Sequence, residues 1–140
     1  MPVFSLLPIE TLQTEYDNLC QKILPSEKPH LFLTERRDDG SAHVKIGENE
    51  YQIIVTERGR ETSRRATKEK DEFLYWMLAD VTFWMAVEFE VKHRIEKQDF
   101  RRLLFAKQLE LLDKVNPKWV DKRRWEINET LQKHPFSDGL

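Results

Sequence analysis

The side chains best suited to chemistry stand where a long apolar segment of the chain ends. Glu90 and His93 form a Glu-x-x-His pair, which on a helix places a carboxylate and an imidazole on one face. Glu96 and Asp99 continue the series at intervals of three residues. Helical carboxylate enzymes bind metal with two such motifs and two further glutamates from facing helices. The sequence has one copy, so a small metal-dependent enzyme built on Glu90, His93 and Glu96 is an alternative and not the leading interpretation.

Other catalytic signatures are missing from the sequence. There is no Gly-x-Ser-x-Gly, phosphate-binding loop, His-Glu-x-x-His or dinucleotide fingerprint. Cys20 is the only cysteine, and its place beside the apolar face of a predicted helix is typical of an inert thiol in the core. The sequence therefore predicts a protein that is not an enzyme and that carries no metal or other cofactor.

A basic cluster over residues 57–70 could bind an acidic partner, because it carries six basic side chains against three acidic ones. The basic residues are Arg58, Arg60, Arg64, Arg65, Lys68 and Lys70. Bases of single-stranded nucleic acids stack on aromatic side chains, yet no aromatic residue lies between Tyr51 and Phe73. Charge of this kind also keeps an exposed sheet edge from pairing with other chains. A nucleic-acid-associated regulator that uses residues 58–70 is a second alternative, and binding of an acidic protein patch fits at least as well.

Asp80 is the one charged residue inside the apolar segment Phe73–Val87. An unpaired charge buried there would cost several kcal/mol, so we expect Asp80 to pair with an arginine or to face a cleft. Pairing within the fold is the preferred interpretation of the two. The arginines considered are Arg64, Arg65, Arg101 and Arg102.

The elements that position these residues follow from the spacing of apolar side chains. Apolar residues recur at helical spacing from Ile9 to Ile23 and predict an N-terminal helix. Alternating residues over 42–46 and 51–55 predict two strands, and Gly59 predicts a turn into a polar strand over 61–66. The short connections favour an antiparallel sheet of three or four strands.

Three helices are predicted after the sheet. Phe73–Val91 is apolar on nearly all sides, which predicts a central helix that is covered on most faces and packed on the sheet. A second helix starts near Gln98 with Phe100 on its buried stripe, and Asn116-Pro117 starts the last one with a cap and a proline at the first helical position. Trp125 lies away from the buried stripe of the last helix, so it is exposed or meets a partner. The order of elements predicts one α+β domain over residues 1–140.

The composition is that of a compact domain with a balanced charge. The chain has 140 residues, 34% charged and 39% hydrophobic, and its eight Phe, four Trp and three Tyr exceed what disordered chains carry. The net charge of −2 divides into −4 over residues 1–56 (five basic, nine acidic) and +2 over residues 57–140 (18 basic, 16 acidic). Met1–Leu7 lacks the features of a signal peptide, and the most apolar stretch is 15 residues long, shorter than a membrane helix. We expect a cytoplasmic protein without a membrane partner.

Four strings occur together in this sequence: VTERGRE at 55–61, DEFLYWMLADVTFWMA at 71–86, HRIEKQDFRRLLFAKQLELL at 93–112 and KHPF at 133–136. In this combination, residues 51–136 resemble the immunity protein 63 family of bacterial polymorphic toxin systems. The resemblance implies a non-enzymatic protein that is encoded beside a toxin and neutralises it by binding.

The surface that would contact a cognate toxin is predicted from residue type. Arginine and tryptophan dominate the energetics of protein interfaces when they are exposed in the free protein. We predict that the contacts include the loop 36–39, the region 58–65 and the last helix, without a nucleic-acid partner and with a homodimer left open. The predicted residues are Arg36, Arg37, Asp38, Asp39, Arg58, Arg60, Arg64, Arg65 and Trp125.

Overall fold

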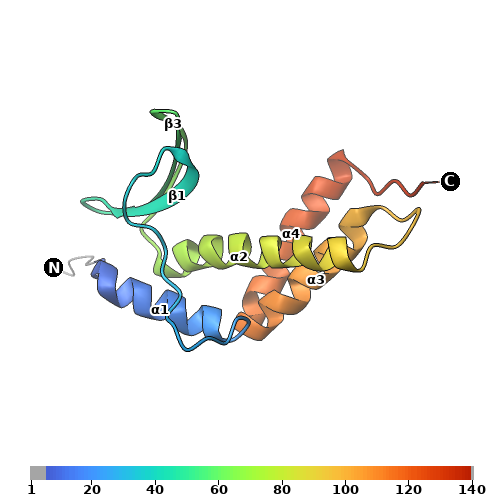
Figure 1. The fold of residues 1–140 in the computed structure, drawn as a ribbon, viewed down its shortest axis with the longest axis horizontal. Coiled ribbons are helices and arrows are strands. Elements are labelled where there is room, and N and C mark those ends of the chain that lie inside the picture. Colours follow the sequence, from blue (N-terminus) through green and yellow to red (C-terminus); the bar gives the residue numbers. More distant parts are fainter. Residues whose placement is uncertain (1–5, 140) are drawn as a thin grey trace. The chain divides into compact units, whose positions relative to one another are not determined.

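The computed structural model describes residues 6–139, which form four helices and a three-stranded antiparallel sheet (Figure 1). The predicted α+β class is confirmed. The elements are α1 (Ile9–Gln21), β1 (Asp39–Ile46), β2 (Tyr51–Glu57), β3 (Arg60–Thr67), α2 (Lys70–Lys92), α3 (Phe100–Val115) and α4 (Pro117–Lys133). The chain divides into two compact units, one up to Trp76 and one from Met77 onward, and α2 contributes residues to both. A single domain over residues 1–140 stays a prediction.

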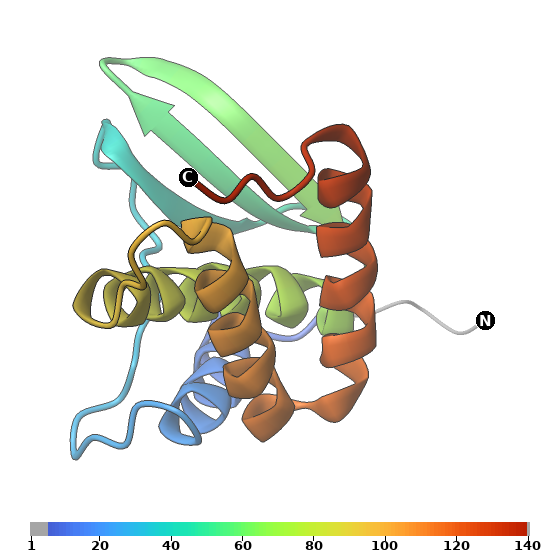
Figure 2. The same cartoon turned by 90° about the vertical axis from the view of Figure 1, so that its right-hand side faces the viewer.

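The sheet is a meander in which each strand pairs with the next along the chain, in the order β1-β2-β3 (Figure 2). Val44, Ile53 and Arg65 lie opposite one another on neighbouring strands, as do His43, Ile54 and Arg64. Since successive side chains of a strand point to opposite faces, these two rows belong to opposite faces of the sheet. Three strands form within residues 6–139, which decides between the predicted three and four.

Aromatic rings hold the first unit together. Tyr16 of α1 packs edge-on against Phe32, with ring centroids 5.4 Å apart, and Phe32 packs in the same way on Phe73 of α2 at 6.0 Å. Phe73 also contacts Tyr51 of β2 at 5.5 Å. The first turns of α2 therefore pack on the sheet, as predicted for this helix. Cys20 is fully buried beside them, and burial raises the pKa of its thiol, which confirms the prediction of a core residue.

In the second unit, Gln108 of α3 connects the helices through its buried amide. Its nitrogen donates to the Ala79 carbonyl of α2 at 3.0 Å, and its oxygen accepts from Nε of Arg123 on α4 at 2.8 Å. The side chain of Gln108 is 1% exposed. Because buried polar groups need hydrogen-bond partners, this arrangement fixes which faces of the helices meet. The Asn116 cap and the proline at the start of α4 are as predicted.

One prediction for the helices is wrong, and another holds with an exception. α2 is covered on most faces, as predicted, but one stripe of it is open: Trp84 is 66% exposed, and Asp80 and Glu88 are exposed as well. α3 begins at Phe100, capped by Asp99, close to the predicted start near Gln98, but the prediction that Phe100 lies on the buried stripe is wrong, because Phe100 is 52% exposed. Phe100 is the first residue of α3, and the buried side chains of that helix begin one turn later, at Leu104. No helix over residues 6–139 is long and apolar enough to span a membrane.

Candidate interaction surface

The tip of the β2–β3 hairpin is a two-residue turn that carries an arginine in an unusual conformation. Glu57 pairs with Arg60, and the residues between them, Arg58 and Gly59, both have positive φ angles of 52° and 79°. Two-residue turns with positive φ at both positions match the twist of the flanking strands, and they favour Asn-Gly or Asp-Gly. The turn predicted at Gly59 is confirmed. Arg58 adopts the left-handed conformation at a cost of about 1 kcal/mol.

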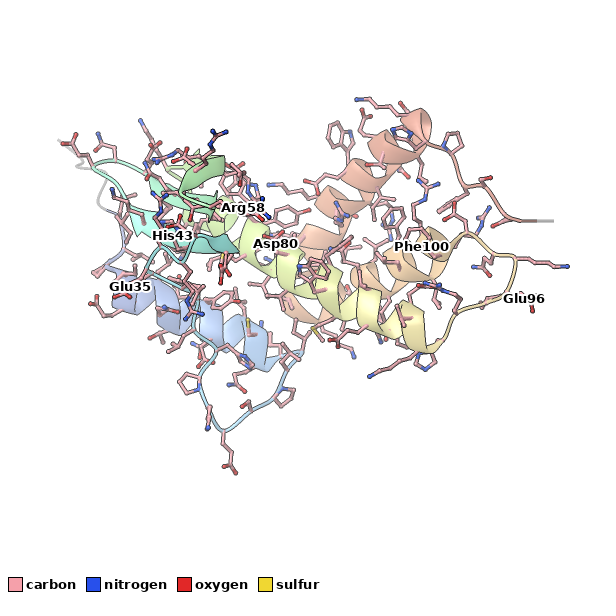
Figure 3. The ribbon with its side chains drawn as sticks, turned by 45° about the horizontal axis from the view of Figure 1, so that its top comes forward. Glu35, His43, Arg58, Asp80, Glu96 and Phe100 are labelled. Atoms are coloured by element: carbon pink, nitrogen blue, oxygen red, sulfur yellow. The ribbon has the colours of Figure 1, made fainter. Side chains whose placement is uncertain are left out.

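The loop 36–39 is joined to this hairpin. The Arg58 amide donates to the Asp38 carbonyl at 3.1 Å, and Asp39 lies opposite Glu57 in the sheet. Asp38 also has a positive φ of 55°. Its carboxylate accepts from Nε of Arg36 at 2.6 Å. Residues 36–39 and 57–60, two segments that were predicted separately, thus form one surface, which we call the sheet-end surface (Figure 3 labels Arg58).

The charges of the sheet-end surface are exposed to solvent. Arg37, Asp39, Arg58 and Arg60 are exposed, and the side chains of Arg36 and Asp38 are 47% and 40% exposed. The hydroxyl and amide of Ser41 donate to Asp39 and lower the pKa of its carboxyl. A shallow depression lined by Glu57, Arg58, Arg60 and Thr62 lies on this surface. Exposed guanidinium groups can bind carboxylates of a partner in bidentate fashion.

The sheet face next to this surface carries a second charged group. Arg64 forms two hydrogen bonds with Glu61, at 2.6 and 3.1 Å, and donates to the amide oxygen of Gln52 at 3.0 Å. These bonds from Arg64, followed by the charges of Arg36 and His43, hold the pKa of Glu61 below its usual range. Arg64 is thereby fixed in position while its side chain stays 44% exposed.

Two polar atoms beneath this group were not singled out from the sequence. Thr56 is 2% exposed, and its hydroxyl oxygen has no hydrogen-bond partner within residues 6–139; the same holds for Nδ1 of His43. His43 lies in the same cross-strand row as Arg64, so strand alternation could have placed it on this face. The sequence carries no signal that Thr56 would be buried there.

Other predicted residues lie elsewhere. Arg65 projects from the opposite face of the sheet, where its guanidinium stacks over Trp76 at 5.2 Å. Lys70 pairs with Glu15 at 3.2 Å. Trp125 belongs to the second unit and is 65% exposed, which is one of the two outcomes predicted for it.

The predicted metal ligands do not form a metal site. Glu90 is 2% exposed and accepts two hydrogen bonds from Arg94, at 2.7 and 3.0 Å, which hold its pKa below the usual range. His93 follows the last residue of α2, and its ring stacks on Phe89 with centroids 4.1 Å apart. Over residues 6–139 there is no group of three His, Cys, Asp or Glu side chains that could hold a metal ion. The carboxylate that would start such a site is already occupied by Arg94.

A different set of Arg and Asp side chains lies in the second unit. Asp99 accepts from the amide and guanidinium of Arg101 and from the Ser137 amide. Arg102 pairs with both oxygens of Asp138, at 3.1 Å each. Bonding to Arg101 first, then to the Ser137 amide, holds the pKa of Asp99 far below its usual range. We call Asp99, Arg101, Arg102 and Asp138 the Asp99 cluster.

The Asp99 cluster binds the segment after α4 to the start of α3. Arg101 donates to the carbonyls of His134 and Pro135, each at 2.8 Å. The ring of Phe136 lies under the guanidinium of Arg102 at 4.2 Å and near Phe105 at 6.3 Å. The string KHPF therefore has a structural use, because it holds the end of α4 to the start of α3.

Comparison with known proteins identifies one family. The family model described as Immunity protein 63 matches residues 48–129, which is more than half of the chain. The match includes β2, β3, α2 and α3 in full, and it stops short of the string at 133–136. No curated protein and no solved structure matches the chain.

Proposed function

The chain belongs to the immunity protein 63 family, and from this we propose that it is a bacterial, cytoplasmic immunity protein of a polymorphic toxin system. It binds a cognate toxin domain and neutralises it without chemistry of its own. Binding blocks the active site of the toxin or its assembly.

The family match carries this proposal, and the sheet-end surface supports it by offering a place for a partner to bind. This surface presents Arg36, Arg37, Arg58 and Arg60 from two segments that a backbone hydrogen bond joins. Arg58 stands where a turn of this kind favours asparagine. A residue that costs stability and remains exposed points to a use for its side chain outside the fold. Arg36, whose guanidinium Asp38 already holds in place, loses little side-chain entropy when it meets a partner.

The chemistry of the surface indicates an acidic patch on the toxin. Arg58 and Arg60 reach solvent beside Glu57, so a carboxylate of the partner would find two donors at one end of the sheet. Arg64 is oriented by Glu61 and Gln52 and extends the same basic area. Arg65 and Trp125 stay in the proposal as contacts from other parts of the chain, and Trp125 would supply an apolar anchor.

Co-expression tests the proposal. The product of the gene next to the one for this chain is expressed in bacteria with and without this protein, and growth is measured. We expect the neighbouring product to stop growth alone and the pair to grow. If the neighbouring product is harmless, or if its toxicity is unchanged by this protein, the proposal is wrong.

A matched pair of variants then locates the surface. Arg58→Ala with Arg60→Ala should remove protection, whereas Lys114→Ala with Lys133→Ala, which deletes the same charge from exposed positions of α3 and α4, should keep it. Both proteins should melt near the temperature of the wild type, because surface substitutions seldom change stability by more than about 0.5 kcal/mol.

A further inference from the structure

The exposed face of α2 in the second unit combines a large apolar residue with carboxylates. Asp80, Trp84, Glu88 and Val91 follow one another at spacings of four, four and three residues, which places them on one side of the helix. Trp84 is 66% and Val91 62% exposed, and Asp80 and Glu88 are exposed too. We call these four residues the Trp84 stripe (Figure 3 labels Asp80).

The indole of Trp84 is the centre of this stripe. Its ring packs edge-on against Phe83, with centroids 5.6 Å apart and planes at 82°. Half-buried Val81 and Val87 lie one turn to either side on the same helix. A tryptophan that is held by neighbours and still exposed is the kind of residue that anchors an interface, because it buries a large area at little cost in entropy.

The stripe itself carries two carboxylates and no basic side chain, although Arg94 pairs with nearby Glu90 and Lys107 of α3 lies over the Phe89 ring at 4.6 Å. Residues 71–91 contain five acidic and no basic side chains. The exposed Trp125 of α4 also has an aspartate four residues before it and a glutamate four residues after it. Around Trp125, however, the helix also carries basic residues, and Arg124 pairs with Asp121 at 3.6 Å. The Trp84 stripe is therefore the more strongly acidic of the two tryptophan surfaces.

This charge pattern argues against a second copy of the chain as the occupant. If two copies paired α2 in antiparallel fashion about Trp84, Asp80 of one copy would face Glu88 of the other. In parallel pairing each acid would face its own equivalent. Like charges brought together at an interface oppose association, so the stripe is complementary to a basic surface and not to itself.

We propose that the Trp84 stripe is a docking surface for the cognate toxin, whose matching surface is an apolar pocket for the indole rimmed by lysine or arginine side chains. This inference rests on the proposed function and names the chemistry of the partner. Trp84 fills the pocket and slows dissociation, while Glu88 attracts the basic rim and speeds association.

Binding kinetics test the inference. The neighbouring gene product, made with its toxic activity removed, is fixed to a biosensor, and the full-length chain is passed over it. We expect Trp84→Ala to raise the dissociation rate at least about 30-fold, with partial recovery in Trp84→Phe. Glu88→Lys should lower the association rate about tenfold at low salt and much less at high salt. Asp113→Lys, the same charge change at an exposed position of α3, is the control and should bind like the wild type.

The outcomes separate this inference from the function. If wild-type protein binds and protects while Trp84→Ala and Glu88→Lys bind equally well, the stripe is not a docking surface and the function stands. If the wild type neither binds nor protects, the proposed function fails. If the mass in solution is that of a dimer and Trp84→Ala makes it monomeric, the occupant is a second copy and the inference is overturned. Melting curves of each variant show that it is folded.

Discussion

The sheet-end surface and the Asp99 cluster use the same residue types in opposite ways. In the Asp99 cluster, Arg101 donates to Asp99 and to two carbonyls of the chain after α4, and its side chain is 20% exposed. At the sheet end, Arg58 and Arg60 are exposed on a turn that reaches into solvent. One group of arginines completes the fold, and the other remains open to a partner.

The difference shows that arginine content alone does not identify an interaction surface. The two groups of arginines differ in the position of the carboxylates and carbonyls that accept their hydrogen bonds. Asp99 accepts four hydrogen bonds from two segments, and such bonds involving charged groups are roughly twice as strong as neutral ones. Arg36 at the sheet end pairs with Asp38 only two residues away, and exposed pairs of this kind contribute little to stability. If this difference matters, changes in the Asp99 cluster should lower stability, and changes at the sheet end should weaken binding of the partner.

The largest effect is expected from reversing charge at the sheet end. Arg58→Glu with Arg60→Glu should weaken binding to the toxin about 100-fold, because an acidic patch of the partner would then be repelled. The melting temperature should stay close to that of the wild type. Titration calorimetry and circular dichroism measure the two effects. A binding constant equal to that of the wild type would remove the sheet end from the interface.

The next effect is expected in the second unit and concerns stability. Gln108→Ala deletes the amide that bonds to Ala79 and Arg123 and leaves a cavity. The free energy of unfolding should fall by about 2 kcal/mol, measured by urea denaturation. Gln132→Ala, at an exposed position of α4, is the matched control and should change it by less than about 0.5 kcal/mol. If toxin binding by folded Gln108→Ala dropped as far as in the double arginine variant, polar groups of the second unit would also serve recognition.

Asp99 gives a smaller effect that depends on pH. Its pKa is depressed in the folded protein, so its contribution to stability is full above the pKa of the unfolded chain, about 3.9. The contribution is lost as the pH falls through the folded pKa. Asp99→Asn should therefore be less stable than the wild type at neutral pH, and the gap should narrow below about pH 4. Melting temperatures from pH 7 to pH 2 check this; a gap that is constant over that range would mean that Asp99 does not act through its charge.

The sequence was a good guide where local geometry decides the structure. The alternation around Ile53 predicts β2, and Asn116-Pro117 predicts the start of α4, because pleating and capping depend on a few neighbouring residues. The exposure of Trp84 could not be predicted from periodicity, since a helix that is apolar on all sides does not reveal which faces other elements cover.

The candidate surface could be predicted only in part, because the sequence does not show which distant segments contact each other. Residues 36–39 and 58–60 could be named from their types, and strand alternation could also have separated Arg64 from Arg65. The hydrogen bond between Arg58 and Asp38 joins segments twenty residues apart. This hydrogen bond lies beside a register shift of β1 near Asp39, which no pattern in the sequence predicts.

The smallest effect is expected from Arg58, where one substitution should change stability and toxin binding in opposite directions. Arg58→Asn creates an Asn-Gly turn, the pair that best fits positive φ at both positions. We expect the free energy of unfolding to rise by about 0.5 kcal/mol, while binding to the toxin weakens about tenfold because the guanidinium is gone. Arg58→Lys keeps the charge and the strained backbone, so it should show neither the gain in stability nor the full loss of binding. Urea midpoints and calorimetry measure both quantities. If Arg58→Asn were more stable and bound the toxin like the wild type, the strain at the hairpin tip would have no role in recognition. The contrast between the exposed arginines of the sheet end and the bonded arginines of the Asp99 cluster would then rest on Arg60 and its neighbours alone.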